Sequence, residues 1–171
     1  MKVWKNMLLI AGTNRNVGKT TFACRVIEQI SQQQSVVAIK ITPHFHTDCI
    51  TCIPLFESKN LLIAEESSRT ALKDSSKMLA AGAKKVYYIQ SFDENLSVAM
   101  DYLMPLIPND VAVVCESAAL RRIVIPGLFV VMSLNDSISK NSDLIPLADF
   151  HLIDFNYNVN GIRFNDGFWI K

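Results

Sequence analysis

The sequence feature that most constrains the fold is a set of six short, continuously apolar segments rich in Val and Ile. Apolar runs of this length suit strands that are buried on both faces of a parallel sheet, because helices cover both sides of such a sheet. Helical patterns lie between several of the segments. This alternation predicts an α/β fold with three layers, in which helices flank a mostly parallel sheet. The predicted strands are residues 7–11, 36–41, 86–90, 111–115, 128–132 and 150–155.

Three segments between the predicted strands have the character of helices. In residues 19–30 the apolar side chains fall on one stripe, as in a helix that packs against a sheet. Asp74 is expected to cap a second helix that ends at Gly82, and Asp93 is expected to cap a third. Residues 161–171 contain a turn sequence between short apolar stretches and predict a C-terminal β-hairpin.

Length and composition limit the classes of protein to consider. A chain of 171 residues, half of them apolar and 19% charged, fits a single globular domain over residues 1–171. The formal charge of +1 gives no electrostatic reason to expect nucleic acid or an anionic membrane as a partner. No apolar run is long enough to cross a bilayer, so we expect a cytoplasmic protein. Cys24 and Cys115 are expected in the core, and no disulfide is expected. A homodimer is compatible with these properties.

The stretch GTNRNVGKTT, residues 12–21, lies between the first predicted strand and the first predicted helix. It ends in Gly-Lys-Thr like a phosphate-binding loop, but the strict spacing requires glycine at position 13, where Thr13 stands. Gly12 is one residue too early. The strand–loop–helix context nevertheless places backbone N–H groups and a helix N-terminus where they bind phosphate. We therefore predict a nucleotide site made by Gly12, Thr13, Asn14, Arg15, Asn16, Val17, Gly18, Lys19, Thr20 and Thr21.

Four residues are given catalytic or metal-binding roles by their positions. Lys19 is expected to contact the β- and γ-phosphates, and Thr20 is expected to bind Mg²⁺. Glu116 ends an apolar strand, where a carboxylate can hold Mg²⁺ or orient a water for attack on the γ-phosphate. The alternative for Glu116 is a glutamate that faces solvent. Lys40 also ends a strand and can meet phosphate or substrate, or extend to solvent as a surface lysine.

The segment HFHTDCITC, residues 44–52, contains residue types that bind metals. His44, His46, Cys49 and Cys52 include a C-x-x-C pair and could form a tetrahedral zinc site, although ligands this close together with no second C-x-x-C give a weak signal. Asp48 could instead approach Mg²⁺. The default interpretation is a loop of solvent-facing residues.

Further candidates concern a second substrate and the nucleotide base. Arg121 and Arg122 could clamp a phosphate or carboxylate of a second substrate, with His44 as another substrate contact, or they could form a solvated loop. Asn135 follows the fifth predicted strand, where many phosphate-loop proteins read the base. Because the N-K-x-D signature is absent, guanine specificity is not predicted, and asparagine is also a common turn residue.

The loop GTNRNVGKT resembles the G-T-D-T-x-V-G-K-T loop of dethiobiotin synthetases, which belong to the P-loop class that includes the MinD and signal-recognition GTPases. The rest of the chain is more similar to the molybdopterin-guanine dinucleotide biosynthesis B proteins (MobB). VVAIKITPHFH stands where that family has V-A-x-x-K-H-T-H-H, KDSSKMLAAGA matches its K-D-S-x-x-x-x-x-A-G-A segment, and VVCES stands at its V-E-G strand end. These motifs occur in the same order over most of the chain, and they imply a P-loop NTPase fold that uses ATP or GTP with Mg²⁺.

Three functions remain open at this point. The first is a slow, Mg²⁺-dependent NTPase coupled to a protein partner or a step of cofactor biosynthesis. The second is an adaptor that holds nucleotide with little turnover, as the MobB resemblance implies. The third is an ATP-dependent ligase of the dethiobiotin-synthetase type, acting on a second small-molecule substrate.

Overall fold

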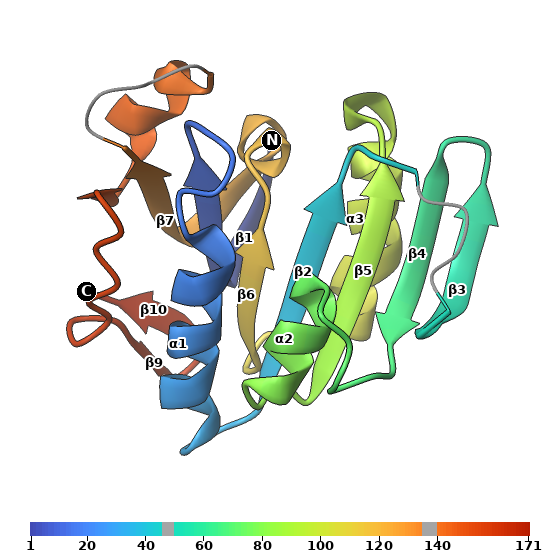
Figure 1. The fold of residues 1–171 in the computed structure, drawn as a ribbon, viewed down its shortest axis with the longest axis horizontal. Coiled ribbons are helices and arrows are strands. Elements are labelled where there is room, and N and C mark those ends of the chain that lie inside the picture. Colours follow the sequence, from blue (N-terminus) through green and yellow to red (C-terminus); the bar gives the residue numbers. More distant parts are fainter. Residues whose placement is uncertain (46–49, 135–139) are drawn as a thin grey trace.

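The computed structural model describes residues 1–45, 50–134 and 140–171. Within these ranges, eight strands form the main sheet and two more form a separate hairpin. The sheet order is β3-β4-β5-β2-β6-β1-β7-β8, and the hairpin pairs β9 with β10 (Figure 1). The strands are β1 (Lys2–Gly12), β2 (Val36–Thr42), β3 (Cys52–Ser58), β4 (Leu61–Glu66), β5 (Lys85–Ser91), β6 (Ala112–Glu116), β7 (Val124–Ser133), β8 (Phe150–Ile153), β9 (Arg163–Asn165) and β10 (Phe168–Ile170).

Six neighbouring strands of the sheet, β5-β2-β6-β1-β7-β8, are parallel and correspond to the six apolar segments. The predicted α/β architecture with a mostly parallel sheet is therefore confirmed. The antiparallel strands β3 and β4 extend the sheet beyond β5 and were not predicted. Most side chains of β3 are exposed, and the strand contains Pro54, so it lacks the apolar pattern of the buried strands.

Helices cover both faces of the sheet. The helices α1 (Lys19–Ser31) and α2 (Asp74–Ala80) lie on one face, and α3 (Leu96–Leu103) lies on the opposite face (Figure 1). The expectation that Asp74 and Asp93 are helix caps is wrong. Lys73 is the N-cap of α2 and Asn95 is the N-cap of α3, and neither makes a side-chain cap hydrogen bond, while Asp93 lies in the 3₁₀ turn before α3. The described residues also contain 3₁₀ turns at Asp93–Asn95, Met104–Leu106, Ala119–Arg122 and Ser142–Leu147.

The central strands bury successive side chains on opposite faces of the sheet. In β1, Leu8 and Ile10 belong to the core under α1, whereas Met7 and Leu9 belong to the core under α3. All four are fully buried. Two covered faces explain why the strand sequences are continuously apolar instead of alternating.

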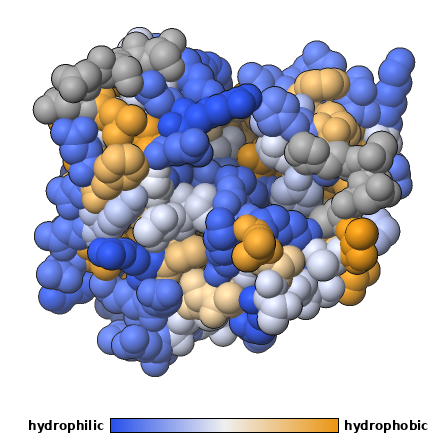
Figure 2. All heavy atoms as spheres, viewed as in Figure 1, coloured by the Kyte–Doolittle hydropathy of each residue, from blue (hydrophilic) through white to orange (hydrophobic). Residues whose placement is uncertain are grey.

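The predicted C-terminal hairpin is present as β9 and β10, and it packs against the core on the α1 side. The rings of Phe164 and Trp169 meet edge to face with their centroids 5.2 Å apart. The indole Nε1 of Trp169 donates a hydrogen bond to the Asn6 carbonyl at 2.8 Å, which ties the hairpin to β1. On the face covered by α1 and α2, apolar side chains form small separate groups on a mostly hydrophilic surface (Figure 2). Among the described residues, no helix has the length and apolar character needed to span a bilayer.

Candidate functional site

The candidate site lies where three parallel strands end side by side. The strands β2, β6 and β1 are neighbours, and their register pairs Lys40 with Glu116 and Glu116 with Ile10. The segment 12–20, which we call the glycine loop, follows β1 directly and leads into α1. The carboxyl ends of parallel strands are the usual ligand-binding edge of an open α/β sheet. The sheet topology therefore brings the glycine loop, Lys40 and Glu116 together.

The local conformation of the glycine loop explains its residue types. Gly18 has φ 87°, and Asn16 has φ 58°, so both lie in the left-handed region that these two residue types tolerate best. Val17 is fully buried between them and anchors the loop in the core. A Cβ atom at Gly12 would lie 2.8 Å from Val17 Cγ2 and 2.9 Å from Lys19 Cδ. A side chain at position 12 would therefore require Val17 and the Lys19 side chain, which folds back across Gly12, to move.

The Lys19 side chain is held inside the loop. Its Nζ donates a hydrogen bond to the Asn14 carbonyl at 3.3 Å, so the ammonium lies over the backbone that a phosphate would contact. Burial lowers the pKa of Lys19, and the nearby Glu116 carboxylate opposes that change. Lys19 is consequently a partly desolvated cation without a carboxylate paired to it within salt-bridge distance in the described part of the chain.

Two carboxylates, a hydroxyl and an ammonium converge beside the glycine loop. The Thr20 hydroxyl donates to Glu116 Oε2 at 2.8 Å. Lys40 Nζ lies 2.7 Å from Glu116 Oε1 and 2.9 Å from Asp74 Oδ2. Glu116 is 4% exposed, so the alternative of a solvent-facing glutamate is wrong, and Lys40 does not extend freely to solvent either.

The electrostatics of this cluster follow from burial and pairing. Burial alone would lower the pKa of Lys40, but the carboxylates of Glu116 and Asp74 raise it above its ordinary value. Burial likewise works to raise the pKa of Asp74, and the Lys40 ammonium outweighs it, so the pKa of Asp74 is lowered. Lys40 therefore remains charged and Asp74 ionised at neutral pH. In this state Lys40 occupies the position between two carboxylates that a divalent cation prefers.

Two cavities open on either side of this cluster. The helix-side cavity, about 570 Å³, is lined by Gly18, Thr21 and Asp74 and by the aromatic residues Phe155 and Tyr157. The strand-side cavity, about 510 Å³, extends over the ends of β2, β5 and β6. Both volumes fall in the range of small-molecule sites. The lining residues common to both cavities are Arg15, Lys19, Lys40, Thr42 and Glu116.

Comparison with protein-family models, curated proteins and solved structures finds no match.

The predicted substrate residues have three different environments. Arg122 lines the strand-side cavity and pairs with Asp143 at 3.1 Å. His44 lines the helix-side cavity, with its Nε2 3.5 Å from Arg15 Nη2. Arg121 does not line either cavity, because its guanidinium lies over the Phe129 ring, 5.3 Å from the centroid. Of the two adjacent arginines, Arg122 therefore faces a cavity and Arg121 packs against an aromatic ring.

Several predicted residues lie outside the described part of the chain. These are Asp48, His46 and Cys49 in the proposed metal segment and Asn135 in the proposed base-reading segment. Among the described residues, no group of three or more His, Cys, Asp or Glu side chains is placed to hold a metal. Cys52 is disulfide-bonded, which contradicts the expectation that no cysteine pairs. Cys115 is buried as expected, whereas Cys24 is only partly buried.

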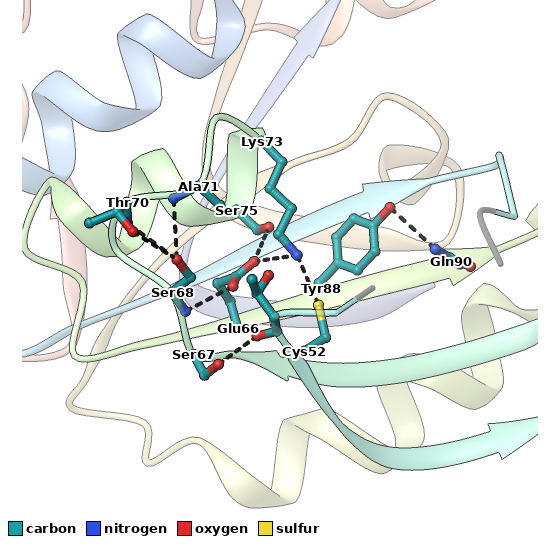
Figure 3. Close-up of polar contacts among 11 residues, drawn as sticks. Cys52, Glu66, Ser67, Ser68, Thr70, Ala71, Lys73, Ser75, Tyr88 and Gln90 are labelled. Carbon is teal, nitrogen blue, oxygen red and sulfur yellow. Dashed lines mark hydrogen bonds and ion pairs between the residues drawn. The ribbon is translucent and has the colours of Figure 1, made fainter. Parts of the chain in front are cut away.

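The sequence reasoning missed Asp74 as a site residue because it assigned Asp74 to a helix cap. A second buried cluster fixes the start of α2, and therefore the position of Asp74 (Figure 3). Glu66, at the end of β4, accepts hydrogen bonds from the Ser68 backbone N–H at 3.0 Å and the Ser75 hydroxyl at 2.7 Å. Lys73 Nζ lies 2.8 Å from Glu66 Oε2. Both residues that flank Asp74 are thus tied to one buried carboxylate.

Asn141 was also missed. Its side-chain Nδ2 donates to the Gly12 carbonyl at 3.0 Å, and the neighbouring Lys140 N–H donates to the Thr13 carbonyl at 3.1 Å. These two hydrogen bonds attach the segment after β7 to the first residues of the glycine loop. No local sequence motif marks them, since the first contact joins residues 129 positions apart in the chain.

Proposed function

We propose that this protein has the P-loop NTPase fold and binds ATP or GTP with Mg²⁺ at the glycine loop. The observation that carries the proposal is the arrangement of Lys19, Thr20 and Glu116, in which the Thr20 hydroxyl meets a buried carboxylate 2.8 Å away beside a desolvated ammonium. A desolvated ammonium above loop backbone and a helix N-terminus is a favourable environment for phosphate oxygens. The resemblance of the loop and later motifs to the dethiobiotin synthetase and MobB families supports the same conclusion.

The donor atoms at the site fit Mg²⁺. This ion prefers oxygen ligands and is usually bound by one or two carboxylates together with substrate phosphates. Thr20, Glu116 and Asp74 would hold it, since Glu116 accepts from Thr20 and both carboxylates contact Lys40 Nζ. When bound, Mg²⁺ would neutralise charge that develops on the phosphates.

Three side chains of this protein have separate roles in phosphate binding and hydrolysis. Lys19 gives up its contact with the Asn14 carbonyl and binds the β- and γ-phosphates. Lys40 keeps Asp74 ionised and holds the carboxylates of Asp74 and Glu116 in place. Glu116 holds the Thr20 hydroxyl and orients the water that attacks the γ-phosphorus. We propose slow hydrolysis, coupled to a protein partner or a cofactor-biosynthetic step.

Binding is tested with Lys19→Ala, compared with Lys84→Ala as the matched control. Lys84 is exposed and immediately precedes β5, at the amino edge of the sheet, so its loss removes the same charge far from the site. Lys19→Ala should weaken ATP or GTP binding by roughly tenfold or more, because charge-assisted hydrogen bonds contribute about 1.5–3 kcal/mol each. Isothermal titration calorimetry measures the affinities. Equal affinities of the two variants would rule out the glycine loop as the phosphate site.

Hydrolysis is tested with Glu116→Gln, which keeps the shape of the side chain, removes its charge and leaves one acceptor oxygen in place of two. Nucleotide should still bind, while phosphate release falls by about tenfold or more. If the protein is instead an adaptor, the parent should release negligible phosphate, and Glu116→Gln should change only the affinity for Mg²⁺. Equal hydrolysis rates in parent and variant would exclude Glu116 from the reaction.

The strand-side cavity favours a second candidate, transfer of the γ-phosphoryl group to a small molecule. It adjoins Lys19 and Glu116 and is also lined by Arg122 and Lys140, which suit an anionic acceptor such as a carboxylate. An acceptor oxygen would attack the γ-phosphorus, the bond to the β,γ-bridging oxygen would break, and the nucleoside diphosphate would leave. Arg122→Met should then reduce acceptor-dependent nucleotide turnover and leave basal hydrolysis unchanged.

A further inference from the structure

The loop after β8 brings two aromatic rings to the helix-side cavity. Phe155 and Tyr157 both line this cavity, and their ring centroids lie 6.3 Å apart. Phe155 is 49% exposed, in contrast to Phe22 and Phe129, which are buried in the two cores. A large exposed aromatic residue that lines a cavity is available to a ligand.

The backbone of this loop is unusual where it leaves β8. Asp154 has φ 53° and Phe155 has φ 59°, so two successive residues other than glycine are left-handed. Such a conformation is unfavourable for a bulky residue and persists only where the surrounding structure imposes it. Here the Asp154 N–H donates to the Ser133 carbonyl at 3.0 Å, and the Asn156 N–H donates to the Ile153 carbonyl at 3.3 Å. Strained residues of this kind concentrate at ligand sites.

Tyr157 is fixed against the start of α1. A Cβ atom at Gly18 would overlap the Tyr157 hydroxyl, so the ring lies directly beside the glycine loop. The Arg25 guanidinium lies 5.1 Å from the centroid of the Tyr157 ring, and its Nη1 donates to the Tyr157 carbonyl at 3.4 Å. The loop after β8 is thus attached to α1, the helix whose N-terminus would receive the phosphates.

We propose that Phe155 and Tyr157 form a stacking platform for the nucleobase of the bound nucleotide. This inference rests on the proposed function, because it assumes that the phosphates lie in the glycine loop. The helix-side cavity is continuous from Lys19 and Thr20 through Gly18 to the two rings, and its volume of about 570 Å³ accommodates a nucleoside. Stacking on an aromatic ring accepts any base, because every base has a π face.

The test compares nucleotides with a ligand that has phosphates but no base. The variants are Phe155→Leu, Tyr157→Leu and the matched control Phe168→Leu, which alters an exposed phenylalanine on β10. The affinities of ATP, GTP and inorganic tripolyphosphate are measured by calorimetry in the presence of Mg²⁺. Thermal melting of each variant verifies that it is folded.

If the two rings form a stacking platform, their replacement should weaken the binding of nucleotides and not that of tripolyphosphate. Phe155→Leu and Tyr157→Leu should weaken ATP and GTP by about 5- to 150-fold, whereas tripolyphosphate should bind within about twofold of the parent. The proposal is overturned if ATP and GTP keep their affinity, or if all three ligands weaken equally, since the rings would then only support the loop. If the parent binds tripolyphosphate and neither variant loses nucleotide affinity selectively, the stacking platform is overturned and the proposed phosphate site is not. A parent that binds none of the three ligands overturns the proposed function as well.

Discussion

Replacing Glu66 by glutamine tests whether the buried cluster at the start of α2 stabilises the protein through charge. The Glu66 side chain is fully buried and bonded to Lys73, Ser75 and the Ser68 backbone. Burial works to raise the pKa of Glu66, but these partners outweigh it and lower the pKa from 4.5 to about 2. Glutamine has nearly the same shape but carries no charge and has one acceptor oxygen in place of two, so the pH-dependent part of the Glu66→Gln effect reports the contribution of the charge.

The size and pH dependence of the effect follow from the pKa shift. A carboxyl whose folded-state pKa is depressed adds stability above its unfolded-state pKa, here 4.5, and loses it as the pH falls through the folded value near 2. A shift of this size corresponds to about 3 kcal/mol of unfolding free energy at pH 7 and to about 1 kcal/mol at pH 3. The difference between parent and variant should therefore shrink by more than half over this interval.

Urea denaturation followed by circular dichroism at pH 7, 5 and 3 measures that difference. Glu65→Gln is the matched control, because Glu65 is the adjacent residue and forms a partly exposed pair with Lys85 at 3.0 Å. Exposed pairs of this kind contribute about 0–1 kcal/mol, so the control should lie close to the parent at every pH. A Glu66→Gln effect that stays constant from pH 7 to pH 3 would refute the charge-based explanation.

Three further predictions concern other parts of the molecule. Lys40→Met leaves the carboxylates of Glu116 and Asp74 without their shared cation, so it should destabilise the protein by about 3 kcal/mol. Mg²⁺ should raise the melting temperature of this variant more than that of the parent. An equal response to Mg²⁺ would argue against a cation site between the two carboxylates. Burial raises the pKa of Cys24 to about 11 and that of Cys115 further, so the thiolate of Cys24 is only about one part in a thousand at pH 8. Iodoacetamide followed by peptide mapping should therefore leave both cysteines unmodified until the protein is denatured, and rapid labelling of either in the native state contradicts this. Trp169→Phe removes a buried hydrogen bond and should cost about 1–3 kcal/mol in urea denaturation, whereas Phe168→Leu on the exposed face of the same strand should cost less than about 0.5 kcal/mol.

The parallel part of the fold was predictable because its signal is local. Each central strand is buried on both faces, so a continuous apolar run identifies it without knowledge of its neighbours. The antiparallel strands gave no such signal. In β3 only the first and fifth of seven residues are partly buried, and Leu61–Glu66 is a short apolar run that ends in two acidic residues. Short strands such as β3, at the edge of the sheet, and β4, beside it, are recognised by their pairing, which a single sequence does not contain.

The candidate site was also predictable only in part, where its residues follow recognisable strands. The glycine loop and Glu116 stand beside recognisable strand ends, and the parallel topology brings them together. Asp74, by contrast, reaches Lys40 only because the cluster around Glu66 sets the start of α2. Phe155 belongs to no sequence motif, because its position at the cavity depends on a left-handed backbone and on packing beside α1. Contacts between segments distant in the sequence decide these positions.

The attachment of the β9–β10 hairpin to the α1 side of the core affects the order of events during synthesis. Ile162, Phe164 and Trp169 are buried in the same core as Phe22 and Ile30 of α1, although nearly the whole length of the chain separates them. Helix α1 is therefore synthesised well before the residues at 162–169 that complete the cover of its apolar face. Non-local contacts of this kind slow folding and leave apolar surface exposed on intermediates. We expect ribosome-bound chains that end before residue 162 to expose the apolar face of α1 and to depend on chaperones until the hairpin emerges.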